Sequence, residues 1–110
     1  MAFDASSFEK TADDTLAAFL DAIDEALGDR LEVDLQGGIL TIELDSGGQY
    51  VINKHGPNRQ IWMSSPVSGA THYDYDETAE QWIGTRDAGP LLDRIAAELK
   101  AKTGVTVELD

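Results

Sequence analysis

The sequence predicts an α+β fold: a two-layer α/β sandwich in which an N-terminal and a C-terminal helix pack on one face of a single antiparallel β-sheet. Both ends of the chain carry apolar residues at helical spacing, whereas the middle alternates apolar and polar residues in short stretches separated by glycine-rich turns. Short strands joined by turns form an antiparallel meander, and two amphipathic helices bury their apolar sides most simply on one face of it. The other face is then open to water.

The two predicted helices differ in length. The first is expected from about residue 7 to residue 27, with Gly28 as its natural end and a regular apolar side formed by Phe8, Ala12, Leu16, Phe19, Leu20, Ile23 and Leu27. The second is expected to begin at Asp87 and Pro90 and to end at Gly104, with an apolar side of Leu91, Leu92, Ile95, Ala96 and Leu99. The final VTVELD is expected to be an extended tail.

Six strands are expected between these helices. Turns are expected at residues 37–38 and 46–48, and the strands read LEVDLQ, ILTIELD, QYVINK, QIWMSS, THYDY and EQWIG. A chain of 110 residues is the length of one ordinary domain, so residues 1–110 are expected to form a single domain.

The stretch QIWMSSP, residues 60–66, predicts a partner-binding surface. Successive side chains of a strand point to opposite faces, so Ile61 and Met63 form one row while Gln60 and Trp62 form the other. The apolar row is expected to pack beneath the helices, which leaves Trp62 on the open face. Aromatic residues are enriched at interface hot spots, so we expect a partner to cover this indole.

The charge and composition exclude several classes of function. A net charge of −13 would repel nucleic acids and anionic membrane surfaces, so neither is expected as a partner. The absence of cysteine removes disulfides, thiolate metal sites and thiol chemistry, and it fits a reducing compartment. The N-terminus shows no secretion signal or transit peptide, and no apolar stretch is long enough to span a bilayer. We expect a cytoplasmic protein.

Acidic residues concentrate in the first half of the chain. Residues 1–45 hold twelve of the 21 acidic side chains, and on the first helix five of them share the exposed side: Asp13, Asp14, Asp21, Asp24 and Glu25. The run continues through Asp29, Glu32 and Asp34. Carboxylates suit hard cations such as calcium, magnesium, manganese or iron, although their spacing is not that of an EF-hand. A weak multi-site metal surface and a solvated acidic face are both compatible with this pattern.

No known catalytic pattern is present. The sequence has no P-loop, no nucleotide-binding glycine fingerprint and no HExxH motif, and the spacing of Ser64, Ser65, His55 and His72 does not support a hydrolase. His72 alternates with Tyr73, so it joins Trp62 on the open face if the tyrosine turns inward. Trp82 is expected to be a core or sheet-edge aromatic residue.

The middle of the chain resembles the frataxin family, and its bacterial members in particular. The resemblance rests on YVINKHGPNRQIWMSSPVSGATHYD (residues 50–74), followed by QWIG, and on GGILTI, the acidic first helix and the second helix after TRDAGPLL. It covers nearly the whole chain. The family's fold is a two-layer sandwich with two helices on one side of an antiparallel sheet, which is the architecture that the residue pattern predicts.

The resemblance implies an accessory protein of iron–sulfur cluster assembly that modulates sulfur transfer without chemistry of its own. Frataxins bind ferrous and ferric iron weakly through an acidic ridge, which on this chain corresponds to Asp21, Asp24, Glu25, Asp29, Glu32 and Asp34. The same ridge docks on the cysteine desulfurase. The open sheet face meets the scaffold protein, and on this chain that surface is Asn53, Gln60, Trp62 and His72.

Two alternatives remain at this point. A ferroxidase or iron-storage protein would oxidise ferrous iron on the ridge and oligomerise, whereas a pure iron chaperone would hand the metal to the scaffold. Dedicated ferroxidase sites bury paired carboxylates and histidines in a helical bundle, which disfavours the first alternative. We expect a monomer that iron could drive into oligomers.

Overall fold

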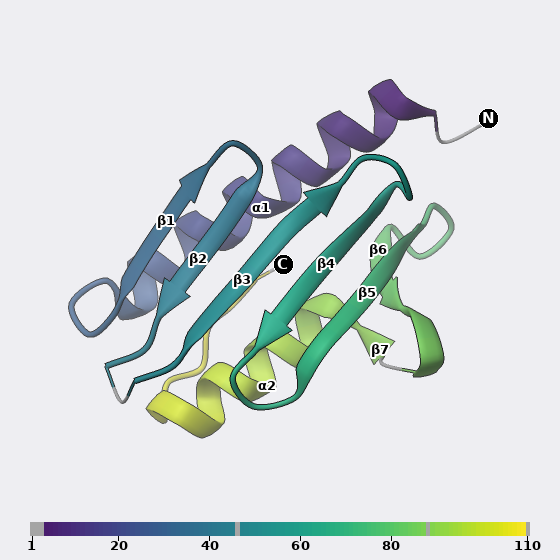
Figure 1. The fold of residues 1–110 in the computed structure, drawn as a ribbon. Coiled ribbons are helices and arrows are strands. Elements are labelled where there is room, and N and C mark those ends of the chain that lie inside the picture. The colour runs from purple at the N-terminus through teal and green to yellow at the C-terminus, as the bar shows by residue number, and fades with distance from the viewer. Residues whose placement is uncertain (1–3, 46, 88, 110) are drawn as a thin grey trace.

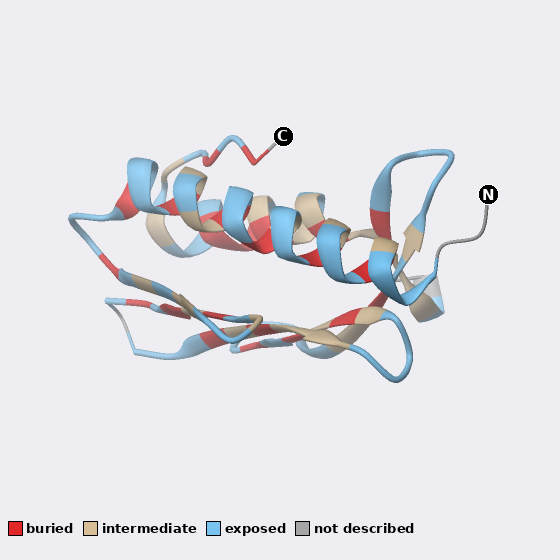
Figure 2. Ribbon diagram, turned by 90° about the horizontal axis from the view of Figure 1, so that it is seen from above, coloured by how far each residue is buried: buried red, intermediate tan, exposed pale blue. Residues whose placement is uncertain are grey.

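The computed structural model describes residues 4–45, 47–87 and 89–109 and confirms the two-layer arrangement (Figure 1). One layer is a seven-stranded sheet in which the strands follow one another in sequence order and each pairs antiparallel with the next. The strands are β1 (Glu32–Gln36), β2 (Ile39–Glu43), β3 (Gln49–His55), β4 (Gln60–Ser65), β5 (Gly69–Asp76), β6 (Gln81–Gly84) and β7 (Gly89–Pro90). Both helices lie on the same side of this sheet, and the opposite face is uncovered (Figure 2).

Helix α1 (Ala5–Leu27) begins two residues earlier than expected because Asp4 caps it. The Asp4 carboxylate accepts a hydrogen bond from the Ser7 backbone N–H at 2.9 Å, which satisfies one of the free donors of the first turn. The expected apolar side is buried, with Leu20 only partly so, and its fully buried members are Phe8, Ala12, Leu16, Phe19, Ile23 and Leu27. Over the described residues, neither helix is long and apolar enough to cross a membrane.

Helix α2 (Leu91–Thr103) begins later than the sequence predicts, so the expected start at Asp87 is wrong. Asp87 instead ends a short 3₁₀ turn, η1 (Thr85–Asp87), and the two residues before the helix pair with β6 as the strand β7. Proline disfavours a right-handed helical conformation in the residue before it, and Gly89 accordingly has φ +77° while Pro90 itself is extended, with φ −68° and ψ +138°. Gly104 ends α2 in the left-handed conformation, with φ +77°.

The turn between β1 and β2 explains the pair of glycines at 37–38. Gln36 and Ile39 face each other across this two-residue loop, and both glycines have positive φ, +58° and +78°. Such a tight hairpin turn needs positive φ at both central residues, which glycine adopts at little cost. In the expected turn at 46–48, Gly47 and Gly48 also have positive φ, while Ser46 lies outside the described residues.

The hydrophobic core lies between the sheet and the helices. Each long strand contributes the row of alternate residues that faces the helices, and these are Leu40, Ile42, Tyr50, Ile52, Ile61, Met63 and Tyr73. The C-terminal tail is extended, as expected, and adds Val107 and Leu109 from the outer side of the helix layer (Figure 2). Trp82 is 4% exposed and packs edge-on against Phe8, which confirms it as a core residue.

One carboxylate, that of Glu98 on α2, is buried within this core. Its oxygens accept hydrogen bonds from the hydroxyls of Tyr50 at 2.8 Å, Ser65 at 2.6 Å and Ser68 at 2.7 Å, and Arg94 lies 3.6 Å away. Burial alone would raise the pKa of Glu98, but the three hydroxyl donors and the arginine outweigh it and hold this pKa below its ordinary value of 4.5. The ionised form therefore ties α2 to β3 and to the loop after β4.

We expect Glu98→Gln to lower the free energy of unfolding at neutral pH by about 1–3 kcal/mol, because the substitution weakens charge-assisted hydrogen bonds. A carboxylate whose folded-state pKa is lowered adds stability above its unfolded-state pKa and loses it as the pH falls through the folded-state value. Urea unfolding between pH 7 and pH 3 should therefore show a flatter acid dependence in Glu98→Gln than in the wild-type protein.

The matched control for this measurement is Glu108→Gln, at an exposed position in the tail. It should change stability by less than about 0.5 kcal/mol. Parallel pH profiles for the wild-type protein and Glu98→Gln would show that folding does not shift the pKa of this carboxyl, contrary to the hydrogen-bond arrangement.

Candidate functional site

The open face of the sheet carries the row that contains Trp62, as the alternation predicts. Ile61 and Met63 are buried beneath the helices, whereas Trp62 is only half-buried. The strand register extends this row across the sheet, because Trp62 lies opposite Asn53 on β3 and opposite His72 on β5. The structure therefore brings these predicted partner-binding residues together on one uncovered surface.

Trp62 is held between two histidine rings. The His55 ring stacks on one side with ring centroids 3.7 Å apart and an interplanar angle of 8°, and the His72 ring stacks on the other at 4.2 Å and 12°. Aromatic pairs add about 0.5–1.5 kcal/mol beyond the area that they bury. This stack fixes the indole in one orientation, so a partner that covers it has little side-chain entropy left to remove.

Gln60 fixes the same indole through its polar edge. The Trp62 Nε1–H donates to Gln60 Oε1 at 2.7 Å, and the Gln60 side-chain amide donates to Asp74 Oδ1 at 2.9 Å. The chain of bonds runs from β4 to β5 across the open face. Of the four predicted partner-binding residues, Gln60, Trp62 and His72 are thus in one contact network, and Asn53 lies beside it on β3.

Two residues of this surface were not predicted as sites from the sequence. His55 supplies one of the two stacked rings, and the sequence did not identify it as a site residue, because the HGPN turn hides the fact that β3 extends as far as His55. Ile39 lies opposite Asn53 and is 45% exposed, which is high for a large apolar side chain. Its outward direction follows from the alternation in β2, so the pattern could have identified it.

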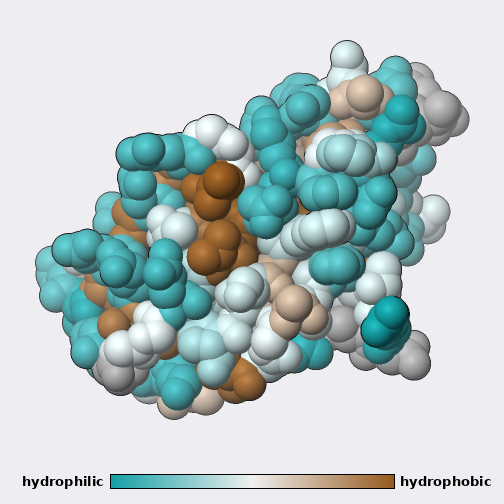
Figure 3. Space-filling model, in the orientation of Figure 1, coloured by the Kyte–Doolittle hydropathy of each residue, from teal (hydrophilic) through white to brown (hydrophobic). Residues whose placement is uncertain are grey.

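The open face is apolar near its middle and hollowed beside the indole. Figure 3 shows hydrophobic surface in this area, ringed by hydrophilic side chains. By register, the outward residues there include Ile39 and the half-buried Val51. A shallow cavity of about 130 Å³ lies next to Trp62 and His72, with further walls from Val51, Asn53, Met63, Ser64 and Ala70. The combination of a fixed aromatic ring, apolar surface and a hollow is typical of a protein-binding surface.

The acidic ridge consists of the six predicted metal ligands, Asp21, Asp24, Glu25, Asp29, Glu32 and Asp34, and all six are exposed. The first three lie on α1 in the helix layer. Val33 and Leu35 turn toward the core, so Glu32 and Asp34 point to the open face of the sheet instead. The ridge therefore passes around the β1 edge and joins the face that carries Trp62.

The ridge is a continuous band of negative charge. Within the described part of the chain, none of the six carboxylates takes part in a salt bridge. Glu43 on β2 lies directly opposite Glu32 and is also exposed, and like charges at such a position destabilise a sheet. Glu43 is thus an acidic neighbour of the ridge that was not predicted as a site residue from the sequence.

The exposed side of α1 carries less uncompensated negative charge than expected, because lysines neutralise two of its five carboxylates. Lys54 of β3 reaches across to Asp13 at 2.8 Å and also pairs with Glu9, and Lys10 pairs with Asp14 at 2.9 Å. Hydrogen bonds to Asp13 and Glu9 raise the pKa of Lys54. Lys54 is distant from α1 in sequence, so only the fold brings it to these acids.

The ridge carboxylates do not form a ready-made chelating site. Across residues 4–45, 47–87 and 89–109, no group of three or more histidine, aspartate or glutamate side chains is close enough to hold a metal ion. The predicted ligands thus form a string along one edge. Any metal held there would meet one or two carboxylates at a time together with water.

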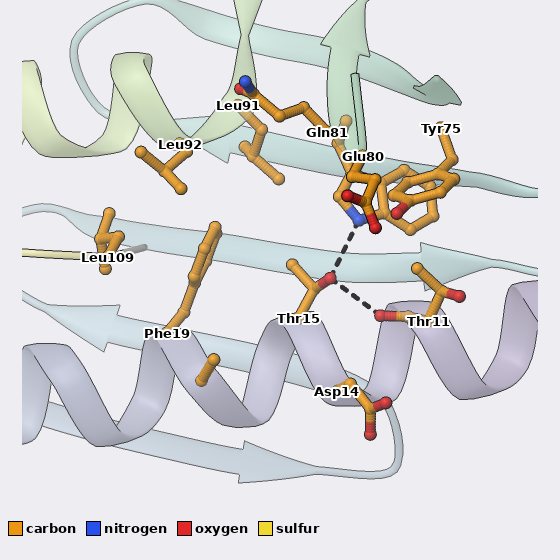
Figure 4. Close-up of a pocket in the computed structure, with 12 residues that line it drawn as sticks. Thr11, Asp14, Thr15, Phe19, Tyr75, Glu80, Gln81, Leu91, Leu92 and Leu109 are labelled. Atoms are coloured by element: carbon orange, nitrogen blue, oxygen red, sulfur yellow. Dashed lines mark hydrogen bonds between the residues drawn. The ribbon is translucent and has the colours of Figure 1, made fainter. Parts of the chain in front are cut away.

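A separate cavity of about 390 Å³ lies in the helix layer, on the other side of the molecule from Trp62. Figure 4 shows Phe19 of α1, Leu91 and Leu92 of α2 and Leu109 of the tail pointing into it. At one end, the Trp82 indole N–H donates to the Thr15 hydroxyl at 3.0 Å, and Thr15 in turn donates to a backbone carbonyl of α1. None of the predicted site residues lines this cavity, and the tail forms one of its walls.

Comparison with known proteins agrees with this geometry. A family model described as a frataxin-like domain matches residues 1–105. The chain belongs to the frataxin family. The iron–sulfur cluster assembly protein CyaY of Thioalkalivibrio sulfidiphilus is 36% identical over 105 residues, which cover 94% of this chain and 96% of that protein.

Eukaryotic frataxins are equally similar in sequence but longer. The mitochondrial frataxin homologue of Schizosaccharomyces pombe is 41% identical over 95 residues, 83% of this chain. This frataxin spans only 57–60% of the length of that relative and of the mitochondrial frataxins of Dictyostelium discoideum and Arabidopsis thaliana.

Solved frataxin structures share the fold. Frataxin from Psychromonas ingrahamii superposes with a TM-score of 0.85 at 26% identity and covers 97% of this chain and 98% of its own. Trimeric frataxin from Saccharomyces cerevisiae, complexed with ferrous iron, superposes with a TM-score of 0.75 at 36% identity and 86% coverage of each chain. The predicted fold and family are therefore confirmed, while the individual site residues stay predictions.

The tail of this frataxin allows a direct test of the helix-layer cavity. Leu109 is 6% exposed, so we expect Leu109→Ala to lower the free energy of unfolding by about 2–4 kcal/mol through lost apolar contacts and an enlarged cavity. Chemical denaturation measures this change. The neighbouring, exposed Glu108→Ala is the control and should stay within about 0.5 kcal/mol of the wild-type value. Equal stability of the two variants would show that the tail is not docked in solution.

Proposed function

We propose that this frataxin is an iron-binding accessory and regulatory protein of iron–sulfur cluster assembly. It docks on a complex of the cysteine desulfurase and the scaffold protein through the acidic ridge and the open sheet face, modulates sulfur transfer, and can supply iron from the ridge. The observation that carries the proposal is the fixed, half-buried Trp62 on an uncovered sheet face that is continuous with uncompensated carboxylates. We place this activity in the cytoplasm.

Relatives of this chain support the proposal. One is named as an iron–sulfur cluster assembly protein, and a structural neighbour was solved in complex with ferrous iron. Exposed carboxylates bind iron through hard oxygen ligands, and isolated ones do so weakly. Weak binding suits a protein that delivers or senses iron, because the metal must leave again.

The charge distribution supports docking on a basic partner. Six exposed carboxylates along one edge of a chain with net charge −13 steer a positively charged surface toward that edge and accelerate association at low salt. The ridge and Trp62 have separate parts in this scheme. The ridge sets the encounter rate and orientation with the desulfurase, while the indole and its apolar surroundings provide short-range contact with the scaffold.

A ferroxidase or iron-storage role is the second candidate, and the trimeric form of the iron-loaded yeast neighbour is the observation that favours it. This role predicts catalysed oxygen uptake and growing oligomers when ferrous-loaded protein meets oxygen. The assembly role predicts a monomer whose ferrous complex alters desulfurase turnover. Anaerobic loading followed by oxygen exposure, monitored by an oxygen electrode and light scattering, separates the two.

Neutralising the ridge should weaken desulfurase binding and reduce its salt dependence. We expect Asp24→Asn/Asp29→Asn to slow association several-fold at low ionic strength and to have a smaller effect at high ionic strength, where charges are screened. Surface plasmon resonance at two salt concentrations measures both rates. Glu77→Gln/Glu108→Gln removes the same charge away from the ridge and should slow association less. Equal slowing by the two double variants would show that only net charge matters.

Truncating the stacked indole should impair the complex and leave the fold intact. We expect Trp62→Ala to weaken binding to the desulfurase–scaffold complex by about 1–3 kcal/mol and to abolish the effect of this protein, with or without ferrous iron, in a cluster assembly assay. Circular dichroism checks the fold. Val67→Ala, at an exposed apolar loop position, is the control and should bind normally. Wild-type affinity for Trp62→Ala would contradict the proposed docking face.

A further inference from the structure

A cavity lies at the edge of the sheet opposite the acidic ridge. The last residue pair between β5 and β6 is Tyr73 with Gly84, so residues 69–72 of β5 pair only with β4. Beyond Gly84 the chain turns away as η1 and then returns as α2. The space left between these segments is a cavity of about 410 Å³, and its lining residues, hereafter the basic notch, are Ser68, Ala70, Thr71, His72, Thr85, Arg86 and Arg94.

The basic notch is unusual for this molecule because of its charge. The chain has eight lysines and arginines and two histidines against 21 acids, yet two arginines and one histidine line this single cavity. None of the described residues that line it is acidic. Three hydroxyl-bearing side chains complete the wall. In a chain of net charge −13, a concave site with this composition favours an anion over a cation.

Arg86 is held in a conformation that arginine seldom adopts. Its φ of +56° and ψ of +40° lie in the left-handed region, where a side chain with a Cβ is disfavoured. Glycine would fit there without strain, as it does at Gly89 three residues later. Strain of this kind concentrates at functional sites and is a reason to ask what the exposed Arg86 side chain contacts.

Arg94 forms the inner wall of the basic notch. It extends from α2 and lies 3.6 Å from the Glu98 carboxylate, a distance of an ion pair rather than of a hydrogen bond. Three hydroxyls donate to that carboxylate and hold it in place. The fixed carboxylate in turn positions Arg94 through their ion pair. The guanidinium group is thus fixed in place with only 28% of the side chain exposed.

We propose that the basic notch binds a phosphate-type oxyanion, either free phosphate or the phosphoryl group of a small molecule, between the guanidinium groups of Arg86 and Arg94. Arginine presents a rigid fork of N–H donors that matches the oxygens of phosphate, and its hydrogen bonds to an anion are charge-assisted. The Thr85 hydroxyl and the His72 ring add further polar groups on the same wall. The proposal does not depend on a role in cluster assembly.

The site would also connect a small anion with the open face. His72 lines the basic notch on one side and stacks on Trp62 on the other, so it belongs to both surfaces. An anion in the notch therefore binds next to the ring that holds the indole in place. Backbone amide signals of residues 69–72 and the Trp62 indole signal should both report its binding.

The test is a titration of the full chain with inorganic phosphate, followed by ¹H–¹⁵N NMR at constant ionic strength maintained with chloride. We expect saturable shifts confined to residues 69–72, Thr85 and the Trp62 indole. Arg86→Gln should weaken phosphate binding roughly tenfold or more, because a charge-assisted pair is lost. Acetate at the same ionic strength should give much weaker shifts, since it presents fewer oxygens and a single charge.

Two further variants distinguish binding from structure. Arg59→Gln is the matched control, since Arg59 is an exposed arginine with φ +52° outside the notch, and it should bind phosphate within about twofold of the wild-type protein. Arg86→Gly should raise the melting temperature by relieving strain and still lose phosphate binding. Shifts that do not saturate, that acetate reproduces, or that Arg59→Gln reduces as much as Arg86→Gln would overturn the proposal.

Discussion

The alternation of side chains along the strands is the constraint on which the rest of this structure depends. Each central strand must bury one row beneath α1 and α2, because the two helices supply apolar surface on only one side of the sheet. Burying Ile61 and Met63 therefore forces Trp62 to the opposite face. The half-buried indole on the open face is not a packing failure. It follows directly from the register that builds the core.

The polar groups show that this open face is organised rather than merely uncovered. Trp62 is stacked between two histidine rings, and Gln60 links its N–H to Asp74 on the next strand. These contacts cross three strands and hold a large aromatic ring in one orientation toward solvent. Such preorganisation reduces the side-chain entropy that is lost when a partner binds. In the free protein it leaves part of a large apolar ring in contact with water.

Charge is separated along the sheet as well. The acidic ridge runs around the β1 edge, where its carboxylates have no basic partners within the described residues, and the basic notch lies beyond the β5–β6 end. Repulsion along the ridge lowers the stability of the folded chain and at the same time makes that edge attractive to cations and basic surfaces. The open face lies between the two charged edges, so a partner docked there can contact both.

The sequence by itself determined the two layers, the one-sided placement of the helices and the direction in which Trp62 points. These features depend on local periodicity, and periods of 3.6 and 2 residues can be read from single segments. The same reasoning placed the six ridge acids on the surface. It misplaced the start of α2 because Pro90 favours two local structures, a helix start and an edge strand, and only the pairing with β6 decides between them.

Only the tertiary structure decided which side chains meet. Lys54 neutralises Asp13 from 41 positions away, His55 and His72 stack on Trp62 from neighbouring strands, and Arg86 and Arg94 both line the basic notch where β6 ends short of β5. None of these arrangements has a sequence period, because each depends on strand register and on where a strand stops. Local pattern therefore sets the face on which a residue lies, whereas the fold as a whole sets its neighbours.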